Sequence, residues 1–432
     1  MSAPSRPPVR VDNALGLLPD LEAMAPLRAL LVSISRPDER ALWSSSGPYL
    51  TLGKRGVQPE ELATRLAEAV RQVTEHLQVL YQAYVEALEA QQRGEGGEVV
   101  AALLRGGRLE EVAGRLLQAR AWYDVALRVS EALPSRRPEA ESLGALGQLS
   151  LALGQYGEGA RHFQRSLALA EAEFDQARAI AACEGLGQAT LAGAEWQGAQ
   201  AWFARGLRLA EASGDRRFLG RLEWRLGVLA RRQGDLGGAV EHLRKARDWL
   251  EAADAPDEMA RVLGVQGELD LTLGRHVAAA VAYREALAWA QRAPRDVAVE
   301  LSIRLRIADL QLETGRLLEA EEEMRRTEQV AIAGNRPAGL VQVYTLMGKL
   351  RGRQHDETGF VFFEQALELC RTLEPSAAAE APVCLEYGLF QERLGHREEA
   401  RAYLERAQQL FAAQGETVER ARAEAELRTL SA

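Results

Sequence analysis

Hydrophobic side chains recur every three or four positions over residues 221–232 and again over 236–246, with a polar break between the two runs. This spacing is that of an amphipathic α-helix, and Gly234 and Asp235 in the break are typical turn residues. The stretch therefore predicts two helices joined as a hairpin. Each helix carries an apolar face that it cannot bury alone, so the hairpin requires neighbours of the same kind.

The hairpin pattern recurs eight times along the chain. Its marker is a small residue on the second helix, at the point where the two helices of a hairpin cross. Successive markers are separated by 40, 40, 40, 40, 41, 39 and 41 residues. A fixed period of this length predicts a solenoid in which each repeat packs against its neighbours. The eight crossing residues are Ala119, Gly159, Ala199, Ala239, Ala279, Ala320, Gly359 and Ala400.

A bulky residue stands four positions after each crossing residue. Twelve positions before each crossing residue, on the first helix, stands a residue that is small in most repeats. Small residues let two helices approach, and bulky ones fill the space between hairpins. We expect the bulky residues to be buried anchors: Tyr123, Phe163, Phe203, Leu243, Tyr283, Met324, Phe363 and Leu404. The first-helix positions are Gly107, Gly147, Gly187, Gly227, Gly267, Ala308, Met347 and Gly388.

At these residues the chain resembles the tetratricopeptide repeat family, whose signature combines a Gly-x-aromatic turn with Ala-x-x-x-aromatic-x-x-Ala. Gly154-Gln155-Tyr156 and Leu186-Gly187 match that signature closely. The period exceeds the common one of about 34 residues. The junction at residues 209–215 resembles the long-repeat subclass found in mitotic-spindle adaptors, bacterial peptide-pheromone sensors and the sensor domains of maltose-type transcription activators. The resemblance implies an all-α, right-handed α-solenoid of about eight helix hairpins.

The segments outside the repeats are assigned from local pattern. We expect a flexible arm over residues 1–20, a helical segment over 21–98, the repeat array over 99–415 and a capping helix over 416–432. A short strand at 49–52 would fall in the loop-like stretch 37–57.

One long helix is predicted over 59–92, and its apolar stripe must be covered. Either it folds back on the first repeat, or a second copy covers it in a homodimer.

Composition excludes several classes of function. The chain has 432 residues and a net charge of -9, which disfavours direct nucleic-acid binding because phosphate contacts need a basic face. We expect the short apolar run at residues 15–18, which Pro19, Asp20 and Glu22 interrupt, to be neither a signal peptide nor a membrane span. Three cysteines, Cys183, Cys370 and Cys384, stand in three different repeats without a CxxC motif. We interpret them as reduced, buried thiols of a cytoplasmic protein.

No catalytic constellation is found, so we expect neither an enzyme nor a bound cofactor or metal. The stretch 47–55 begins like a phosphate loop, but it has five residues between its glycines where four are needed. It also ends in Arg55 where Ser or Thr should bind magnesium. The six histidines are scattered along the chain, and none belongs to a recognisable ligand motif.

The candidate binding site follows from the resemblance. In the family the first helix of each repeat lines a concave groove through its second, fifth, ninth and twelfth positions. The Lys and Asn pattern that captures chaperone tails is absent from these positions. They give the candidate groove residues Gln148, Glu184, Gln188, Arg221, Trp224, Arg231, Arg261, Glu268, Asp309, Tyr344 and Arg351.

Trp224 stands out because arginines surround it in the sequence. One interpretation is an aromatic anchor in a cationic groove that suits an acidic or amphipathic peptide. The other is a partly buried Trp whose neighbouring arginines solvate the helix. Asp270 is also unusual, because the matching positions elsewhere are small or apolar, and it could pair with a groove arginine.

These features predict a noncatalytic protein-interaction scaffold or adaptor that binds a partner's peptide or helix in the groove. The alternative is a signal-sensing regulatory array. Such an array binds a small ligand or peptide. Binding changes the pitch of the superhelix, and this change is passed to its N-terminal segment or to a separate output protein. The two differ in whether the ligand is a segment of a partner protein or a free small molecule or peptide.

Overall fold

The computed structural model describes residues 78–431 except 293–295, 335, 372–375 and 415–416. The chain divides into two compact parts, residues 1–142 and 143–432. The expectations for the flexible arm, the strand at 49–52 and the first part of the long helix fall on residues 1–77, outside the described residues.

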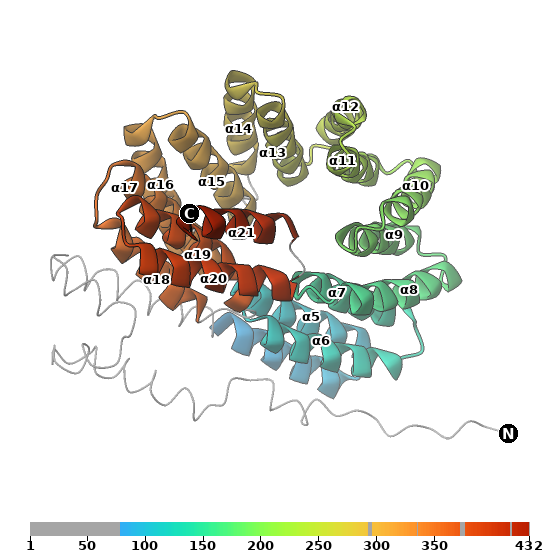
Figure 1. Cartoon of the computed structure of the whole chain (residues 1–432). Coiled ribbons are helices and arrows are strands. Elements are labelled where there is room, and N and C mark those ends of the chain that lie inside the picture. The colour runs from blue at the N-terminus through green and yellow to red at the C-terminus, as the bar shows by residue number, and fades with distance from the viewer. Residues whose placement is uncertain (1–77, 293–295, 335, 372–375, 415–416, 432) are drawn as a thin grey trace, which may run out of the picture. The chain divides into compact units, whose positions relative to one another are not determined.

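The described residues form the end of one helix over 78–93, then eight helix hairpins and one further helix, and every regular element among them is α-helical (Figure 1). The predicted all-α array of hairpins is confirmed. The hairpins are α5 (Gly96–Val112) with α6 (Leu116–Glu131), α7 (Arg137–Ala152) with α8 (Tyr156–Ala172), α9 (Gln176–Ala192) with α10 (Trp196–Ser213), α11 (Arg216–Arg232) with α12 (Leu236–Ala252), α13 (Pro256–Thr272) with α14 (His276–Ala290), α15 (Val297–Glu313) with α16 (Leu317–Ala333), α17 (Pro337–Arg353) with α18 (Gly359–Cys370), and α19 (Ser376–Arg393) with α20 (Arg397–Gln414), and α21 (Thr417–Ser431) follows them.

In the first part, the described end of the long helix covers residues 78–93. Of the apolar stripe predicted for this helix, Leu80 and Tyr84 are buried and Leu88 is partly buried. On its polar side, Glu86 accepts a hydrogen bond from Arg105 of α5. The same part contains the first hairpin, whose anchor Tyr123 lies against Gly107.

In the second part, each anchor of a second helix packs against a small residue of the first helix of its hairpin. Phe163 lies so close to Gly147 that a Cβ there would be only 2.7 Å from the ring, and the ring also faces Gly185 of the next repeat. Phe203 occupies the same place over Gly187 and is fully buried. All eight predicted anchors and all eight crossing residues are buried, so these predictions are confirmed.

The seventh repeat departs from the register of the others. Phe363 packs on Gly348, and Met347 instead joins the cluster around Met324 of the preceding repeat. The prediction that Met347 stands opposite the anchor was therefore wrong by one residue. Helix α18 is also short, with 12 residues. The first helices α17 and α19 are in direct contact with each other, as are other neighbouring first helices.

The turns inside the hairpins need one residue in the left-handed backbone region, where only glycine is free of steric cost. Glycine supplies it in six repeats, for example Gly234 with φ of 81°. In the third repeat Ala194 takes this conformation with φ of 58°, and in the seventh His355 does so with φ of 54°. These two turns carry strain that the others avoid.

The last described helix and the three cysteines are both packed against the array. Helix α21 packs on α20, with Ala423 buried among Leu385 and Leu404, as a cap should. Cys183, Cys370 and Cys384 are free and buried. Burial raises the pKa of the Cys183 thiol to about 11 and that of Cys370 to about 12. No described helix is long and apolar enough to cross a membrane.

Replacing the anchor Phe203 by Ala should destabilise the array by about 3 to 5 kcal/mol, because the cavity between α9, α10 and α11 cannot close completely. Urea unfolding followed by circular dichroism measures the change. The matched control is Phe174→Ala, which removes an aromatic ring that is 90% exposed and should change the free energy by under about 0.5 kcal/mol. Equal effects of the two substitutions would contradict the proposed packing.

Replacing Ala194 by Gly should stabilise the protein by about 0.5 to 1 kcal/mol, because it relieves the left-handed strain of that turn. Gly234→Ala, at the equivalent turn of the next repeat, should destabilise it by about 1 kcal/mol. The two midpoints of thermal unfolding should therefore move in opposite directions. Movement of both midpoints in the same direction would rule out backbone strain as the cause.

Candidate functional site

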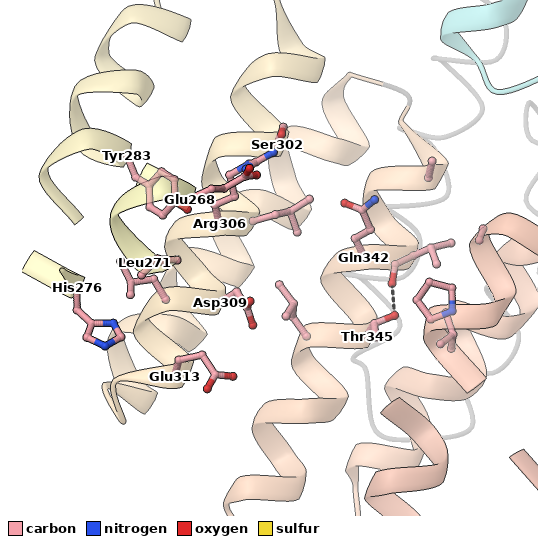
Figure 2. Close-up of a pocket in the computed structure, with 18 residues that line it drawn as sticks. Glu268, Leu271, His276, Tyr283, Ser302, Arg306, Asp309, Glu313, Gln342 and Thr345 are labelled. Atoms are coloured by element: carbon pink, nitrogen blue, oxygen red, sulfur yellow. Dashed lines mark hydrogen bonds and ion pairs between the residues drawn. The ribbon is translucent and has the colours of Figure 1, made fainter. Parts of the chain in front are cut away.

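One cavity stands out in the second part of the chain, with a volume of about 830 Å³ (Figure 2). Residues of the first helices α13, α15, α17 and α19 line it, together with two residues of α14. It therefore lies on the face of the array that the sequence predicted as the groove, in repeats five to eight. The lining residues are Glu268, Leu271, His276, Tyr283, Ser302, Leu305, Arg306, Asp309, Leu310, Glu313, Ala338, Val341, Gln342, Thr345, Leu346, Ala379, Pro382 and Val383.

The floor of this cavity is apolar because the packing of the repeats supplies it. Leu305, Leu310 and Val341 are buried side chains of α15 and α17 that form part of the core and present one side to the cavity. Leu271 and Leu346 are only partly buried, so they offer apolar surface to a ligand. An apolar floor with a few polar groups is the usual composition of a small-ligand or peptide site.

Polar groups stand on the two walls above this floor. In Figure 2 Gln342 of α17 and Asp309 of α15 face the space between their helices. Gln342 and Ser302 are exposed, and within the described part of the chain neither side chain makes a hydrogen bond. Thr345 is already used, because its hydroxyl donates to the Val341 carbonyl at 2.7 Å. Gln342 and Ser302 thus offer donors and acceptors to a bound molecule.

Ion pairs connect the first helices along this face. Glu268 of α13 forms an ion pair with Arg231 of α11 at 2.9 Å and another with Arg306 of α15. Further along, Lys349 of α17 lies 3.0 Å from both Asp309 and Glu313 of α15. Each of these links joins one repeat to the next.

Burial affects the charged and phenolic groups of the cavity. It lowers the pKa of the Arg306 guanidinium, and the nearby positive charge of Arg231 lowers it further. Burial also raises the pKa of Tyr283 to about 12, and the carboxylate of Asp309 adds to that effect. Against the opposing effect of burial, hydrogen bonds from Lys349 and Arg353 hold the pKa of Glu313 below its usual value. At neutral pH the phenol is therefore neutral and Glu313 is ionised.

A second group of predicted residues forms a separate cluster in repeats three and four. Glu184 is only 1% exposed and pairs with both Arg221 and Arg225 of α11, the latter at 2.9 Å. Gln188 donates to the same carboxylate at 3.2 Å. Trp224 is 9% exposed and packs in the core cluster of repeats four and five, with the Arg225 guanidinium 4.1 Å from its ring centre. The arginines around it are therefore paired, and little of the indole is open to a partner.

The remaining predicted residues lie apart from the cavity. Gln148 is exposed on α7, and Arg261 pairs with Asp296 at 3.1 Å. Tyr344 donates to Glu328 of α16 at 3.0 Å, and Arg351 pairs with Glu321 of α16 at 2.8 Å. Asp270 pairs with Arg275, in the turn before α14, at 3.7 Å rather than with a groove arginine. Of the predicted residues, Glu268 and Asp309 line the cavity. Arg231 is not part of the lining, but it forms an ion pair with Glu268.

Sequence reasoning missed Ser302, Arg306, Gln342 and Lys349. For Gln342 the cause is the one-residue shift of the seventh repeat, which counting from Gly359 did not include. A signal was present, because the repeat spacing changes to 41, 39 and 41 in this region. The groups that the structure gathers here can bind a molecule by apolar contact, hydrogen bonds and ion pairs.

A family model described as "Tetratricopeptide repeat" matches residues 381–414, which is the eighth hairpin. No curated protein sequence matches the chain. Among solved structures, the Rap protein complexed with Competence and Sporulation Factor is 13% identical, and the match covers 81% of this chain and 99% of that one with a TM-score of 0.56. The apo form of the quorum sensor NprR from B. thuringiensis is also 13% identical, with 86% and 99% coverage and a TM-score of 0.46.

The likeness to the Rap protein agrees with the hairpin order, the buried anchors and the family match in the eighth repeat. Together these observations identify the fold. The chain has the fold of a tetratricopeptide-repeat solenoid, and its eighth hairpin matches the model of that family.

Proposed function

We propose that the protein is a noncatalytic binding protein that holds a short peptide segment in the cavity of repeats five to eight. The observation that carries this proposal is the combination, in one cavity of about 830 Å³, of an apolar floor with unused hydrogen-bonding groups at Gln342 and Ser302. Sites for small ligands usually measure about 300 to 1,000 Å³. A few extended residues fit this range better than a folded helix about 10 Å wide.

An extended peptide suits the polar walls as well. Its backbone presents an N–H and a C=O at each residue, and these need partners when the peptide is bound. The carboxamide of Gln342 can accept a hydrogen bond from one backbone N–H and donate one to a backbone C=O, because it has two donors and an acceptor. The apolar side chains of the peptide would then rest on Leu271, Leu305 and Leu346.

The size of the cavity also favours the alternative in which this array is a regulatory sensor. A short free peptide would fill the cavity as completely as a segment of a larger protein. The Rap protein of similar fold was solved in complex with Competence and Sporulation Factor, which supports a bound regulatory factor as one use of this fold. The adaptor and the sensor share the same site and differ in the source of the peptide.

Thermal unfolding of the protein with cell extract, split at a small-molecule cutoff, tests the function and separates its two forms. A ligand at about 100 times its Kd stabilises a protein by about 2.7 kcal/mol, which is a shift of several degrees. A shift with the small fraction favours the sensor, and one with the protein fraction favours the adaptor. If neither fraction raises the unfolding temperature, the proposal is wrong.

Ser302→Trp should abolish that shift, because an indole at this exposed position of α15 would project into the cavity and obstruct ligand binding. The variant's own unfolding temperature should stay within about 1 °C of the wild type, since Ser302 is exposed and makes no hydrogen bond with the described residues. The matched control is Ala288→Trp, at an exposed position of α14 outside the cavity. A shift that persists in Ser302→Trp would place the ligand elsewhere.

A further inference from the structure

The charges at one end of the cavity do not balance. Two guanidiniums, from Arg231 and Arg306, meet the single carboxylate of Glu268. Figure 2 shows Arg306 and Glu268 close together beside Ser302 at this end. The excess at this point is one positive charge.

The neighbouring charges do not remove the excess. Asp309 and Glu313 are held by Lys349, and Glu313 also accepts from Arg353 at 2.9 Å. Of the ion-pair groups, Arg306 and the carboxylates Glu268, Asp309 and Glu313 line the cavity. Their partners Arg231, Lys349 and Arg353 approach from outside the lining, which makes four cations against three carboxylates. Glu386, which also acts on Lys349, is itself paired with Arg422. Asp270 is occupied by Arg275 outside this set, and the Tyr283 phenol is neutral at neutral pH.

The surplus charge is also poorly solvated. Burial lowers the pKa of both arginines, which means that the surroundings disfavour their charged forms. The Arg231 Nε is buried and has no hydrogen-bond partner among the residues that the structure describes. Yet the side chains remain about 28% and 33% exposed, and Arg306 lines the cavity, where a ligand can reach it. A buried cation without a full set of partners costs free energy that an incoming anion would recover.

We propose that the Arg231 and Arg306 end of the cavity binds a carboxylate of the ligand. This rests on the proposed function, and it assigns the chemistry by which a peptide would be oriented in the site. A carboxylate carries one negative charge, which equals the excess, and its two oxygens fit the planar fork of a guanidinium. Ser302 and the Tyr283 hydroxyl, which line the same cavity, are neutral donors that can complete its hydrogen bonds.

The carboxylate can come from the C-terminus of a peptide or from an acidic side chain, and three hexapeptide libraries distinguish these sources. The first has a free C-terminus and lacks Asp and Glu. The second is amidated and contains Asp and Glu, and the third is amidated and lacks them. After equilibrium dialysis against the wild-type protein, mass spectrometry measures the retained fraction of each library.

We expect the first or the second library, or both, to be retained at least about tenfold more than the third, as a charge-assisted hydrogen bond would give. Preference for the first identifies the C-terminus, and preference for the second identifies a side chain. Equal retention of all three overturns the carboxylate site while leaving the peptide-binding function intact. Retention of none overturns both.

Two variants that change the charge in opposite directions test the proposal, because they should change the preference for carboxylates in opposite directions. Arg306→Gln removes the excess positive charge and should abolish the preference for carboxylates. Glu268→Gln frees both guanidiniums and should increase it severalfold. The matched control is Arg261→Gln, which changes an exposed arginine of α13 that pairs with Asp296 outside the cavity and should leave the preference unchanged. A decrease in Glu268→Gln with an intact unfolding temperature would contradict the proposal.

Discussion

The close fit between a bulky side chain on each second helix and a small residue on the first helix is the constraint on which this structure depends. At Gly147 and Gly187 the ring of Phe163 or Phe203 occupies the space that a Cβ would need. The contact fixes the distance between the two helices and the rotation of the first helix about its own axis. That rotation decides which side chains of the first helix turn toward the core and which are left for a ligand.

The ion pairs between the first helices have a different role from the anchor contacts. A partly buried ion pair contributes little net stability, because desolvation offsets most of the attraction. Glu184 with Arg221 and Arg225, or Glu268 with Arg231 and Arg306, are therefore poor candidates for what holds the array together. What they determine is the charge that a ligand meets. Around Trp224 the pairing leaves little of the indole exposed, whereas beside the cavity it leaves a guanidinium in excess.

The sequence predicted the hairpins and their buried contacts well, because the same spacing of small and bulky residues recurs in every repeat. The 40-residue period located the hairpins, the anchors and the crossing residues. It could not show whether Trp224 is open or covered, since that depends on side chains of the next repeat. The ion-pair partners were also missed, although they carry a usable signal: Asp309 and Lys349 lie 40 residues apart, one repeat period. Opposite charges one period apart on the first helices would have located this pairing.

The position of the cavity follows from the place where the periodicity fails. In a regular array each first helix presents equivalent positions at the same depth, so no part of the face is enclosed more than another. In the seventh repeat the anchor packs on Gly348, one residue later than the pattern, and the hairpin turn has His355 where glycine is usual. The shift turns Gln342 and Thr345 toward the cavity, and Pro382 interrupts the backbone hydrogen bonding of the next first helix. A distinct cavity at this point is therefore a consequence of an irregular repeat inside an otherwise regular frame.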